Sequence, residues 1–183
     1  FEAVYEAARI SVQHMTPVIF MSDGYIANGA EPWKFPKSED LPSITVKFKT
    51  ELDEDEEQLK PYQRDEKLAR PWAIPGTPGL EHRIGGLEKQ DITGNVSYDP
   101  DNHQHMVKTR QAKVDKIADY IPLQKLDSGP EKGKILILGW GSTYGPIHQA
   151  VRAARRKGLD VSHVHVRHIW PMPKNLGDLL RGF

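Results

Sequence analysis

Apolar positions divide the chain into regular segments at both ends and a long irregular stretch between them. Over residues 1–15 the apolar side chains recur at helical spacing, which predicts a helix with one buried face. Residues 18–21 form an unbroken apolar run, which is typical of a strand buried on both faces. Apolar and polar residues then alternate over 44–49, which predicts a half-buried strand.

The last third has the clearest pattern. It predicts a buried strand over 134–138, an amphipathic helix over 147–157, a second strand over 161–166 and a helix that begins at 176. A strand, helix and strand in this order predict a parallel pair with a right-handed crossover. Two parallel strands do not make a stable sheet alone. We therefore expect further strands from the earlier segments, from another copy of the chain or from sequence after residue 183.

The middle of the chain has little periodicity. Six of the seven residues from 51 to 57 are acidic, and their mutual repulsion favours a solvated loop. Residues 61–100 are rich in proline and glycine, and a loop of that length is usually functional or wraps a partner. Helical spacing returns over 105–120, where the basic stretch 108–116 is interpreted as a solvated helix face.

Composition excludes several classes of function. The 25 basic and 25 acidic residues cancel, so there is no general electrostatic reason to bind nucleic acid or a membrane surface. There is no cysteine, which excludes disulfides, thiolate catalysis and cysteine-bound Fe–S clusters within this chain. No signal peptide and no apolar run of membrane-spanning length are present, so we expect a cytoplasmic location.

The two ends do not resemble natural termini, because each lies within or just after a helical pattern. We therefore expect a piece of a longer protein. Apolar faces exposed at its ends would favour self-association, so the fragment is a possible homo-oligomer.

A glycine-rich turn, Gly139 to Gly145, separates the predicted strand from its helix. Such a turn can hold a pyrophosphate, which leaves an NADP-binding Rossmann-like module as an alternative. However, Tyr144 stands where that motif has its third glycine, and no acidic residue ends the next strand, where Arg167 could instead face a 2′-phosphate. We favour tight packing of strand and helix as the reason for the glycines. A hydroxyl of the turn, from Ser142 or Thr143, is expected to cap the helix.

Histidines occur in two groups. His163 and His165 share one face of a predicted strand, with His168 just after it. That face has no cysteine and no acidic residue, so we predict no metal site. His103 and His105 flank a helix start, where capping or solvent exposure explains them. None has a visible partner carboxylate, so no general base is assigned.

Three groups of residues, in order and in register, resemble the α subunit of the 2-oxoacid:ferredoxin oxidoreductases, nearer to the 2-oxoglutarate type than to the pyruvate type. The first is Thr16 to Ala27 with Glu31-Pro32-Trp33, which is similar to the end of a pyrimidine-binding domain. The second is Gly79 to His82, followed by a set of later residues: Asp99, Pro100, His103, Met106, Arg110 and Lys113. The third combines 138–145 with 170–176 and is similar to the C-terminal domain of transketolases.

The resemblance implies a fold and a division of the chain. The fold is α/β, an incomplete doubly wound parallel sheet like the transketolase C-terminal domain, with a long Pro/Gly-rich connector. Residues 1–36 would be the C-terminal end of the pyrimidine-binding domain for thiamine diphosphate, plus a linker. Residues 37–132 would be the connector, with a strand, a long loop and a helix, and 133–183 the first half of the transketolase-C-like domain.

The resemblance also implies a reaction, the oxidative decarboxylation of a 2-oxoacid to an acyl-CoA. The intact complex would use thiamine diphosphate, Mg²⁺ and Fe–S clusters, with a β subunit, ferredoxin and coenzyme A as partners. The activating carboxylate would lie upstream of Phe1 and the diphosphate site on the β subunit. No catalytic, cofactor-binding or metal residue is therefore expected in this chain, which by itself would be inactive and would serve scaffold and interface roles.

Four residues match family positions that face the active-site side or a subunit interface: Asp23, Asn28, Glu81 and His82. One departure stands beside them, since Arg83-Ile84 follows where acidic residues are expected. A non-catalytic assembly domain is a further alternative.

Overall fold

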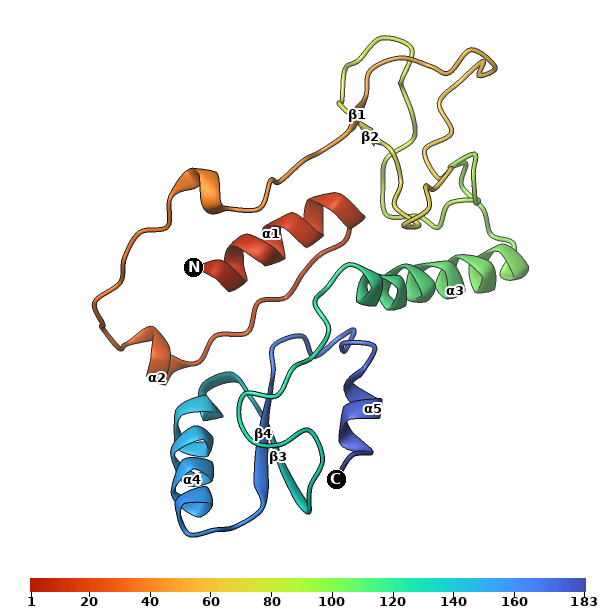
Figure 1. Cartoon of the computed structure of the whole chain (residues 1–183). Coiled ribbons are helices and arrows are strands. Elements are labelled where there is room, and N and C mark those ends of the chain that lie inside the picture. Colours follow the sequence, from red (N-terminus) through yellow and green to blue (C-terminus); the bar gives the residue numbers. More distant parts are fainter. The chain divides into compact units, whose positions relative to one another are not determined.

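A computed structural model describes all residues, 1–183, and divides them into two compact units. Each unit is built from segments that are apart in the sequence. The first unit contains residues 1–20 and 36–117, and the second contains 21–35 and 118–183 (Figure 1). Both sheets are parallel and two-stranded and are accompanied by helices, so the predicted α/β class is confirmed. None of the helices is long and apolar enough to cross a membrane.

The first unit contains two long helices. The predicted N-terminal helix is confirmed as α1 (Glu2–His14), which buries Ile10 and His14. The second, α3 (Pro100–Lys116), begins five residues earlier than predicted. Its start has a local cause, because the Asp99 side chain accepts a hydrogen bond from the backbone N–H of Asp101 at 3.0 Å and Pro100 occupies the first helical position.

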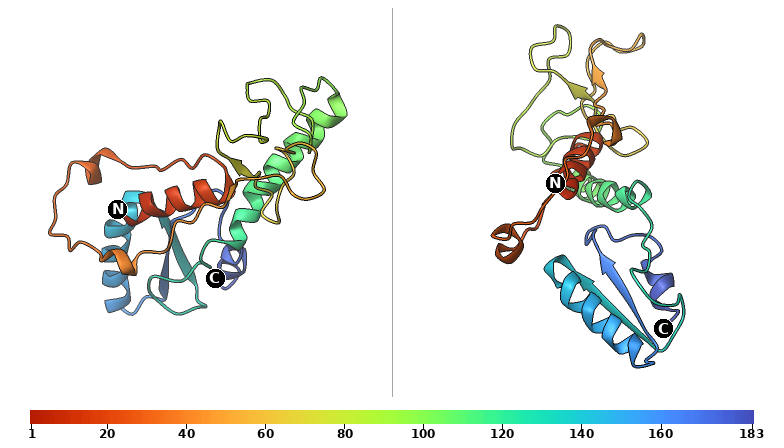
Figure 2. Two further views of the ribbon diagram at one scale, coloured as in Figure 1. Left: turned by 90° about the horizontal axis from the view of Figure 1, so that it is seen from above. Right: turned by 60° about the vertical axis from the view of Figure 1, so that its left-hand side comes forward.

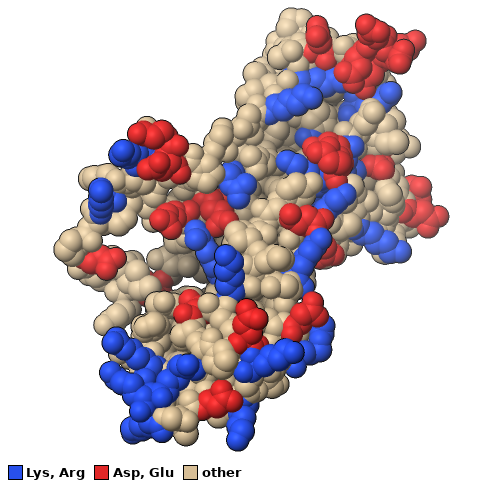
Figure 3. All heavy atoms as spheres, in the orientation of Figure 1, with Lys and Arg blue, Asp and Glu red and all other residues tan.

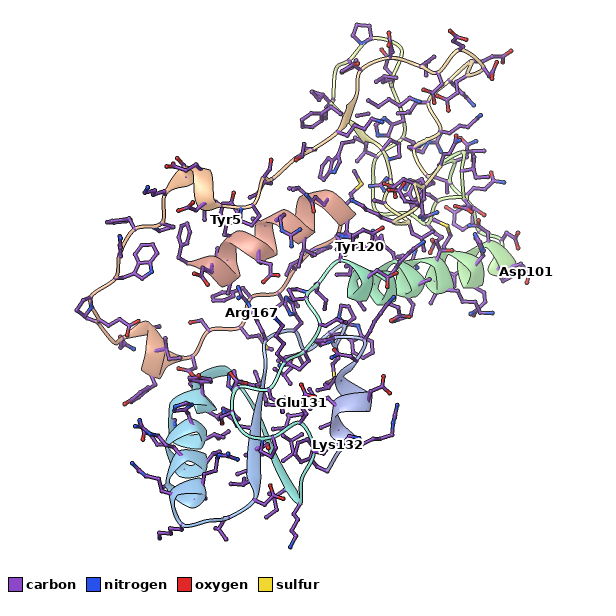
Figure 4. All side chains as sticks on the ribbon, in the orientation of Figure 1. Tyr5, Asp101, Tyr120, Glu131, Lys132 and Arg167 are labelled. Carbon is purple, nitrogen blue, oxygen red and sulfur yellow. The ribbon has the colours of Figure 1, made fainter.

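In the part of the chain that separates α1 from α3, only a short sheet forms. The predicted strand over 44–49 is reduced to β1 (Phe48–Lys49), which pairs in parallel with β2 (Trp72–Ala73). The rest of this region is irregular apart from one turn of 3-10 helix, η1 (Ser38–Asp40). Tyr5 on α1 extends toward the segment after that turn (Figure 4) and donates from its hydroxyl to the backbone carbonyl of Pro42 at 2.8 Å.

The acidic stretch 51–57 follows β1 and is largely exposed, as predicted. Its carboxylates form the red cluster at the upper right of Figure 3. Two of them fold back onto the strand, because Lys49 Nζ lies 2.7 Å from Asp53 and 2.6 Å from Glu56. One lysine on β1 therefore fixes the conformation of the acidic loop.

The second unit contains the predicted strand, helix and strand. Its strands β3 and β4 are parallel and pair from Ile135↔Val161 to Trp140↔Val166, which confirms the predicted pair. Its elements in chain order are α2 (Gly24–Ala27), most of η2 (Ile117–Asp119), β3 (Ile135–Trp140), η3 (Gly141–Thr143), α4 (Tyr144–Arg156), β4 (Val161–Val166) and α5 (Leu176–Leu180).

Helices α4 and α5 cover opposite faces of this small sheet (Figure 2). On the α5 side, Val164, Val166 and Leu176 form a buried apolar cluster, with Leu126, Leu136 and Leu179 packed around it. Successive residues of a strand point to opposite faces. The α4 side of β4 therefore carries His163 and His165, an unusual composition for a buried sheet face.

A loop segment that the apolar pattern does not predict covers the second edge of β4. Ser128 and His163 exchange backbone hydrogen bonds in an antiparallel bridge, and Asp127 accepts the His165 N–H at 2.7 Å. The Ser162 hydroxyl donates to the Pro130 carbonyl at 2.8 Å. The central strand β4 thus has partners on both edges although the sheet has only two strands.

The predicted strand over 18–21 does not form. These residues pair with no other strand, and the four apolar side chains are exposed, Ile19 to 86%. An apolar strand buried on both faces needs neighbouring strands and covering layers, and no other segment of this chain supplies them.

Candidate functional site

The first unit contains a cavity of about 610 Å³ between its irregular loops. We call it the loop pocket. Its walls are mainly apolar and aromatic, and the charged side chains that line it are all cationic. The lining residues used below are Phe48, Tyr62, Arg70, Trp72, His82, Arg83 and Lys89.

The aromatic wall is positioned by the β1–β2 pair. In that pair Phe48 lies directly beside Trp72. The indole N–H of Trp72 donates to the backbone carbonyl of Val12 at 2.8 Å. This bond attaches the wall to α1, so two segments separated by 60 positions hold one surface in place.

Two arginines surround the Tyr62 ring. The guanidinium carbons of Arg70 and Arg64 lie 4.6 Å and 5.4 Å from the ring centroid, within the range of cation–π attraction. Tyr62 is itself held by its backbone N–H, which donates to the Ile92 carbonyl at 3.2 Å. The ring thus places the positive charge of Arg70 at the pocket wall without a carboxylate beside it.

Lys89 supplies a buried charge, with only 3% of the residue exposed. Its Nζ donates to the carbonyls of Gly85, at 3.0 Å, and Leu87. Carbonyl dipoles offset part of the cost of burying an ammonium group. Lys89 therefore stabilises the turn around Gly85, which forms one rim of the loop pocket.

The two sequence candidates in this unit differ in position. His82 is half-buried and lines the pocket, and its Nδ1 lies 2.8 Å from the Leu80 carbonyl. In the neutral ring this contact places the proton on Nδ1 and leaves Nε2 as an acceptor. Glu81 is exposed and is not part of the wall. With cationic donors and no carboxylate, the pocket can bind an anionic group on a partly apolar ligand.

The other two candidates, Asp23 and Asn28, lie in the second unit on either side of α2. The Asp23 carboxylate accepts the Ile26 N–H at 2.9 Å, and Asn28 donates from its amide to the Gly24 carbonyl at 2.6 Å. The hydrogen bond from Ile26, followed by one from Ser142, lowers the pKa of Asp23. Both side chains therefore stabilise a local turn in this structure.

The glycine turn has a packing explanation. A Cβ on Gly139 would lie 2.4 Å from Ile147 Cδ1 and 2.9 Å from the Thr143 hydroxyl, so helix and strand approach too closely for a side chain. The predicted helix cap is wrong. Thr143 stands at the N-cap of α4, but its hydroxyl donates to the Trp140 carbonyl and no side chain caps the helix.

The prediction that His103 and His105 lack carboxylate partners is also wrong. His103 Nδ1 lies 2.8 Å from Glu88, and His105 Nε2 lies 2.7 Å from Asp91. The acids come 14 and 15 residues earlier, in the irregular loop, so no local pattern could reveal the pairs. The hydrogen bond from His103 is the main cause that lowers the pKa of Glu88. These pairs attach the loop to α3.

Three imidazoles and a phenol gather on the α4 side of the second sheet. The Tyr144 ring lies 5.6 Å from His148, 5.6 Å from His163 and 5.0 Å from His165. Both ring nitrogens of the fully buried His163 lack a hydrogen-bond partner, and burial is the main cause that lowers its pKa. No three His, Cys, Asp or Glu side chains are placed to hold a metal ion.

Comparison with known proteins agrees with the motifs. The 2-oxoglutarate oxidoreductase subunit KorA of Mycobacterium tuberculosis is 50% identical over the whole chain. The α subunit of 2-oxoacid:ferredoxin oxidoreductase 1 of Aeropyrum pernix is 29% identical over 94% of it. Among solved structures, the 2-oxoglutarate:ferredoxin oxidoreductase of Magnetococcus marinus, with 2-oxoglutarate, coenzyme A and succinyl-CoA bound, matches 95% of the chain with a TM-score of 0.76 and 28% identity.

The match covers only part of those proteins. The chain spans 27% of the length of both curated relatives and 29% of the matched chain of known structure. No family model matches it. The resemblance to 2-oxoacid:ferredoxin oxidoreductase α subunits that the motifs indicate is confirmed, and the chain corresponds to one segment of such a subunit.

Proposed function

We propose, from this homology, that the chain is a segment of the α subunit of a cytoplasmic 2-oxoacid:ferredoxin oxidoreductase that oxidises 2-oxoglutarate to an acyl-CoA. The observation that carries the proposal is the 50% identity, without loss of coverage, to a 2-oxoglutarate oxidoreductase subunit. A match of this extent includes the irregular loops, and loop sequences diverge fastest when only the fold is retained.

The metal cofactors of such an enzyme do not fit the residues of this segment. Thiamine diphosphate, when bound, supplies the electron sink for decarboxylation, and Fe–S clusters carry the electrons away. This segment has no cysteine and no group of three metal ligands, so Mg²⁺ and the clusters would be held by other segments or by a β subunit. Its own roles are to support the active site and to form subunit contacts.

We propose the division into domains that the motifs indicate: 1–36 at the end of a pyrimidine-binding domain, 37–132 as connector and 133–183 as half of a transketolase-C-like domain. The exposed apolar run 18–21 supports the first boundary, because a strand buried on both faces needs neighbours that the rest of the subunit can provide. The paired strands and helix of the second unit support the last.

The candidates Asp23, Asn28, Glu81 and His82 are proposed to lie on the active-site side or at a subunit interface. For His82 the support is its place in the loop pocket beside cationic residues. The 2-oxoacid, coenzyme A and ferredoxin are all anionic, and a pocket with cations and no carboxylate suits contact with any of them.

The proposal is tested on the complete parent subunit co-expressed with its candidate β subunit. The assay measures reduction of a viologen dye that depends on coenzyme A, with 2-oxoglutarate and pyruvate in parallel and thiamine diphosphate added. Turnover with 2-oxoglutarate and not with pyruvate is expected. A folded, cofactor-loaded complex that turns over no 2-oxoacid would refute the oxidoreductase assignment.

A second experiment separates a role in binding from a role in assembly alone. Arg70→Gln with Arg83→Gln removes two cations from the loop pocket. The control, Arg181→Gln, removes the cation that follows α5 and lies outside the loop pocket. A raised KM for one substrate in the double variant, with an intact complex, is expected. Unchanged kcat and KM in an assembled complex would favour a purely structural segment.

A further inference from the structure

A second cavity, of about 480 Å³, lies beside α4 and is independent of the function proposed above. Four of its lining residues come from one face of the helix: His148, Arg152, Arg155 and Arg156. Arg152 comes four residues after His148, and Arg155 and Arg156 come three and four residues after Arg152. Residues three or four apart are neighbours on the surface of an α-helix. Ser128, from the segment beside β4, also lines the cavity.

The charge of this cavity is of one sign. Three guanidinium groups line it and no carboxylate does. In Figure 3 the basic side chains over α4 form the largest blue group on the visible face of this unit. Like charges one turn apart on a helix repel and destabilise it. The cluster therefore has a cost that folding alone does not require.

The helix dipole accounts for only part of the cluster. Cations in the last turn of a helix are stabilising, which explains Arg155 and Arg156 at the end of α4. It does not explain Arg152 or His148, which lie nearer the middle. Arg155 is also oriented, because its Nη1 donates to the Val161 carbonyl at 3.1 Å. Arg152 and Arg156 have no hydrogen bond or ion pair within the chain, so both guanidinium groups are available to an external anion.

The histidine is held in a fixed orientation. Its ring stacks on Tyr144, with centroids 5.6 Å apart and planes at 23°. Its Nδ1 is buried without a partner, so Nε2 is the nitrogen that can reach a ligand in the cavity. One imidazole and three guanidinium groups, with Ser128 beside them, thus line one open cavity. This arrangement suits a compact anion better than an extended one.

We propose that this cavity binds a phosphate group of a small-molecule ligand, a diphosphate or a phosphomonoester with two negative charges. The planar fork of arginine matches phosphate oxygens in pairs. A phosphomonoester carries nearly two charges at pH 7, which balances several cations where a single carboxylate would not. The volume is within the range of small-ligand pockets. An acidic protein surface, in contrast, would need a broad patch and gains nothing from a concave site.

The test uses the complete subunit in its complex, with no other phosphate-bearing ligand added. Inorganic pyrophosphate is titrated, and hydrogen–deuterium exchange is followed in peptides that cover 144–160. Saturable protection of these peptides is expected. Arg152→Gln with Arg156→Gln should raise the pyrophosphate concentration at half-maximal protection about a hundredfold or more, because the charge-assisted hydrogen bonds of two guanidinium groups are lost.

Two further variants keep the result specific. Lys157→Gln removes a charge from the same end of α4 but lies outside the lining, and it should change the midpoint less than about threefold. Arg152→Lys keeps the charge and loses the fork, so an intermediate weakening of about tenfold is expected. Three results would overturn the proposal. The first is absence of protection in the unmodified complex, and the second is an equal effect of Lys157→Gln and the double variant. The third is protection by a hexaglutamate peptide but not by pyrophosphate.

Discussion

The side chain of Lys113 on α3 donates from its Nζ to the backbone carbonyl of Met15, the residue that ends α1, at 2.8 Å. Met15 has a left-handed backbone conformation, with φ of 44°. The two residues are 98 positions apart. This one hydrogen bond therefore gives a partner to a backbone carbonyl at the end of α1 and joins α1 to α3, the two long helices of the first unit.

We predict that Lys113 titrates near pH 8, well below an ordinary lysine. Burial is the main cause that lowers its pKa to about 8, followed by repulsion from Arg64, Arg70 and Arg110. The measurement is reductive methylation with ¹³C-formaldehyde and an NMR titration of the intact subunit. One methyl-lysine resonance should move with a midpoint near pH 8, and Lys113→Arg should remove that resonance.

The same shift predicts how stability changes with alkaline pH. Between about pH 8 and the ordinary lysine value of 10.5, the unfolded chain binds more protons at this position than the folded chain. Stability contributed by this site therefore rises with pH through that window. The quantity to compare is the denaturant midpoint at pH 9.5 minus the midpoint at pH 7.5. This signed difference should be smaller in Lys113→Met than in the unmodified subunit. An equal or larger difference would contradict the prediction.

Asp91→Asn should loosen the loop that precedes α3. Asp91 joins Arg64 at 2.5 Å and His105 at 2.7 Å. Burial alone would raise the pKa of Asp91, but the hydrogen bonds from His105 and Arg64 outweigh it and lower the pKa. This contribution to stability is present above the ordinary value of 3.8 and is lost as pH falls through the lower folded value.

Loss of one charged partner should cost about 1–3 kcal/mol locally. Hydrogen exchange of the amides in 88–92 should accelerate about tenfold or more in Asp91→Asn. Glu51→Gln is the matched control, because it neutralises an exposed acid of the acidic loop that makes no hydrogen bond or ion pair with α3. Equal exchange in the two variants would show that the Asp91 pairs do not hold the loop.

Much of the second unit could be predicted from the sequence, because β3, α4, β4 and α5 carry strong periodic patterns over at least five residues. In the first unit the two helices could be predicted, but the loops between them could not. Its sheet is two residues per strand, and its order depends on single side chains such as Trp72 and Lys89 that bond to distant carbonyls. Such bonds have no local sequence signal. Of the residues that line the loop pocket, the sequence therefore indicates only His82, which lies beside an acidic residue in a glycine-rich loop and matches a family position.

Gly139→Ala should destabilise the second unit. The added methyl group would meet Ile147 and Thr143 inside normal contact distance, and overpacking of this kind typically costs about 1–3 kcal/mol. Gly145→Ala is the control, because nothing lies within 4 Å of a Cβ there and the residue is helical. The measurement is the thermal melting temperature of the intact subunit. A lower value for Gly139→Ala and an unchanged or higher value for Gly145→Ala are expected.

The exposed apolar run 18–21 leads to the last prediction. If the rest of the subunit pairs with this segment, Ile19 is a core residue there although it is 86% exposed in this chain. Ile19→Lys should then bury an unpaired ammonium group, which is among the most destabilising single changes.

Leu159→Lys is the control, because Leu159 is 58% exposed in the turn between α4 and β4. The measurement is the yield of soluble, protease-resistant complex after co-expression. A strong loss for Ile19→Lys alone is expected, and equal yields would show that 18–21 stays at the surface of the assembled enzyme.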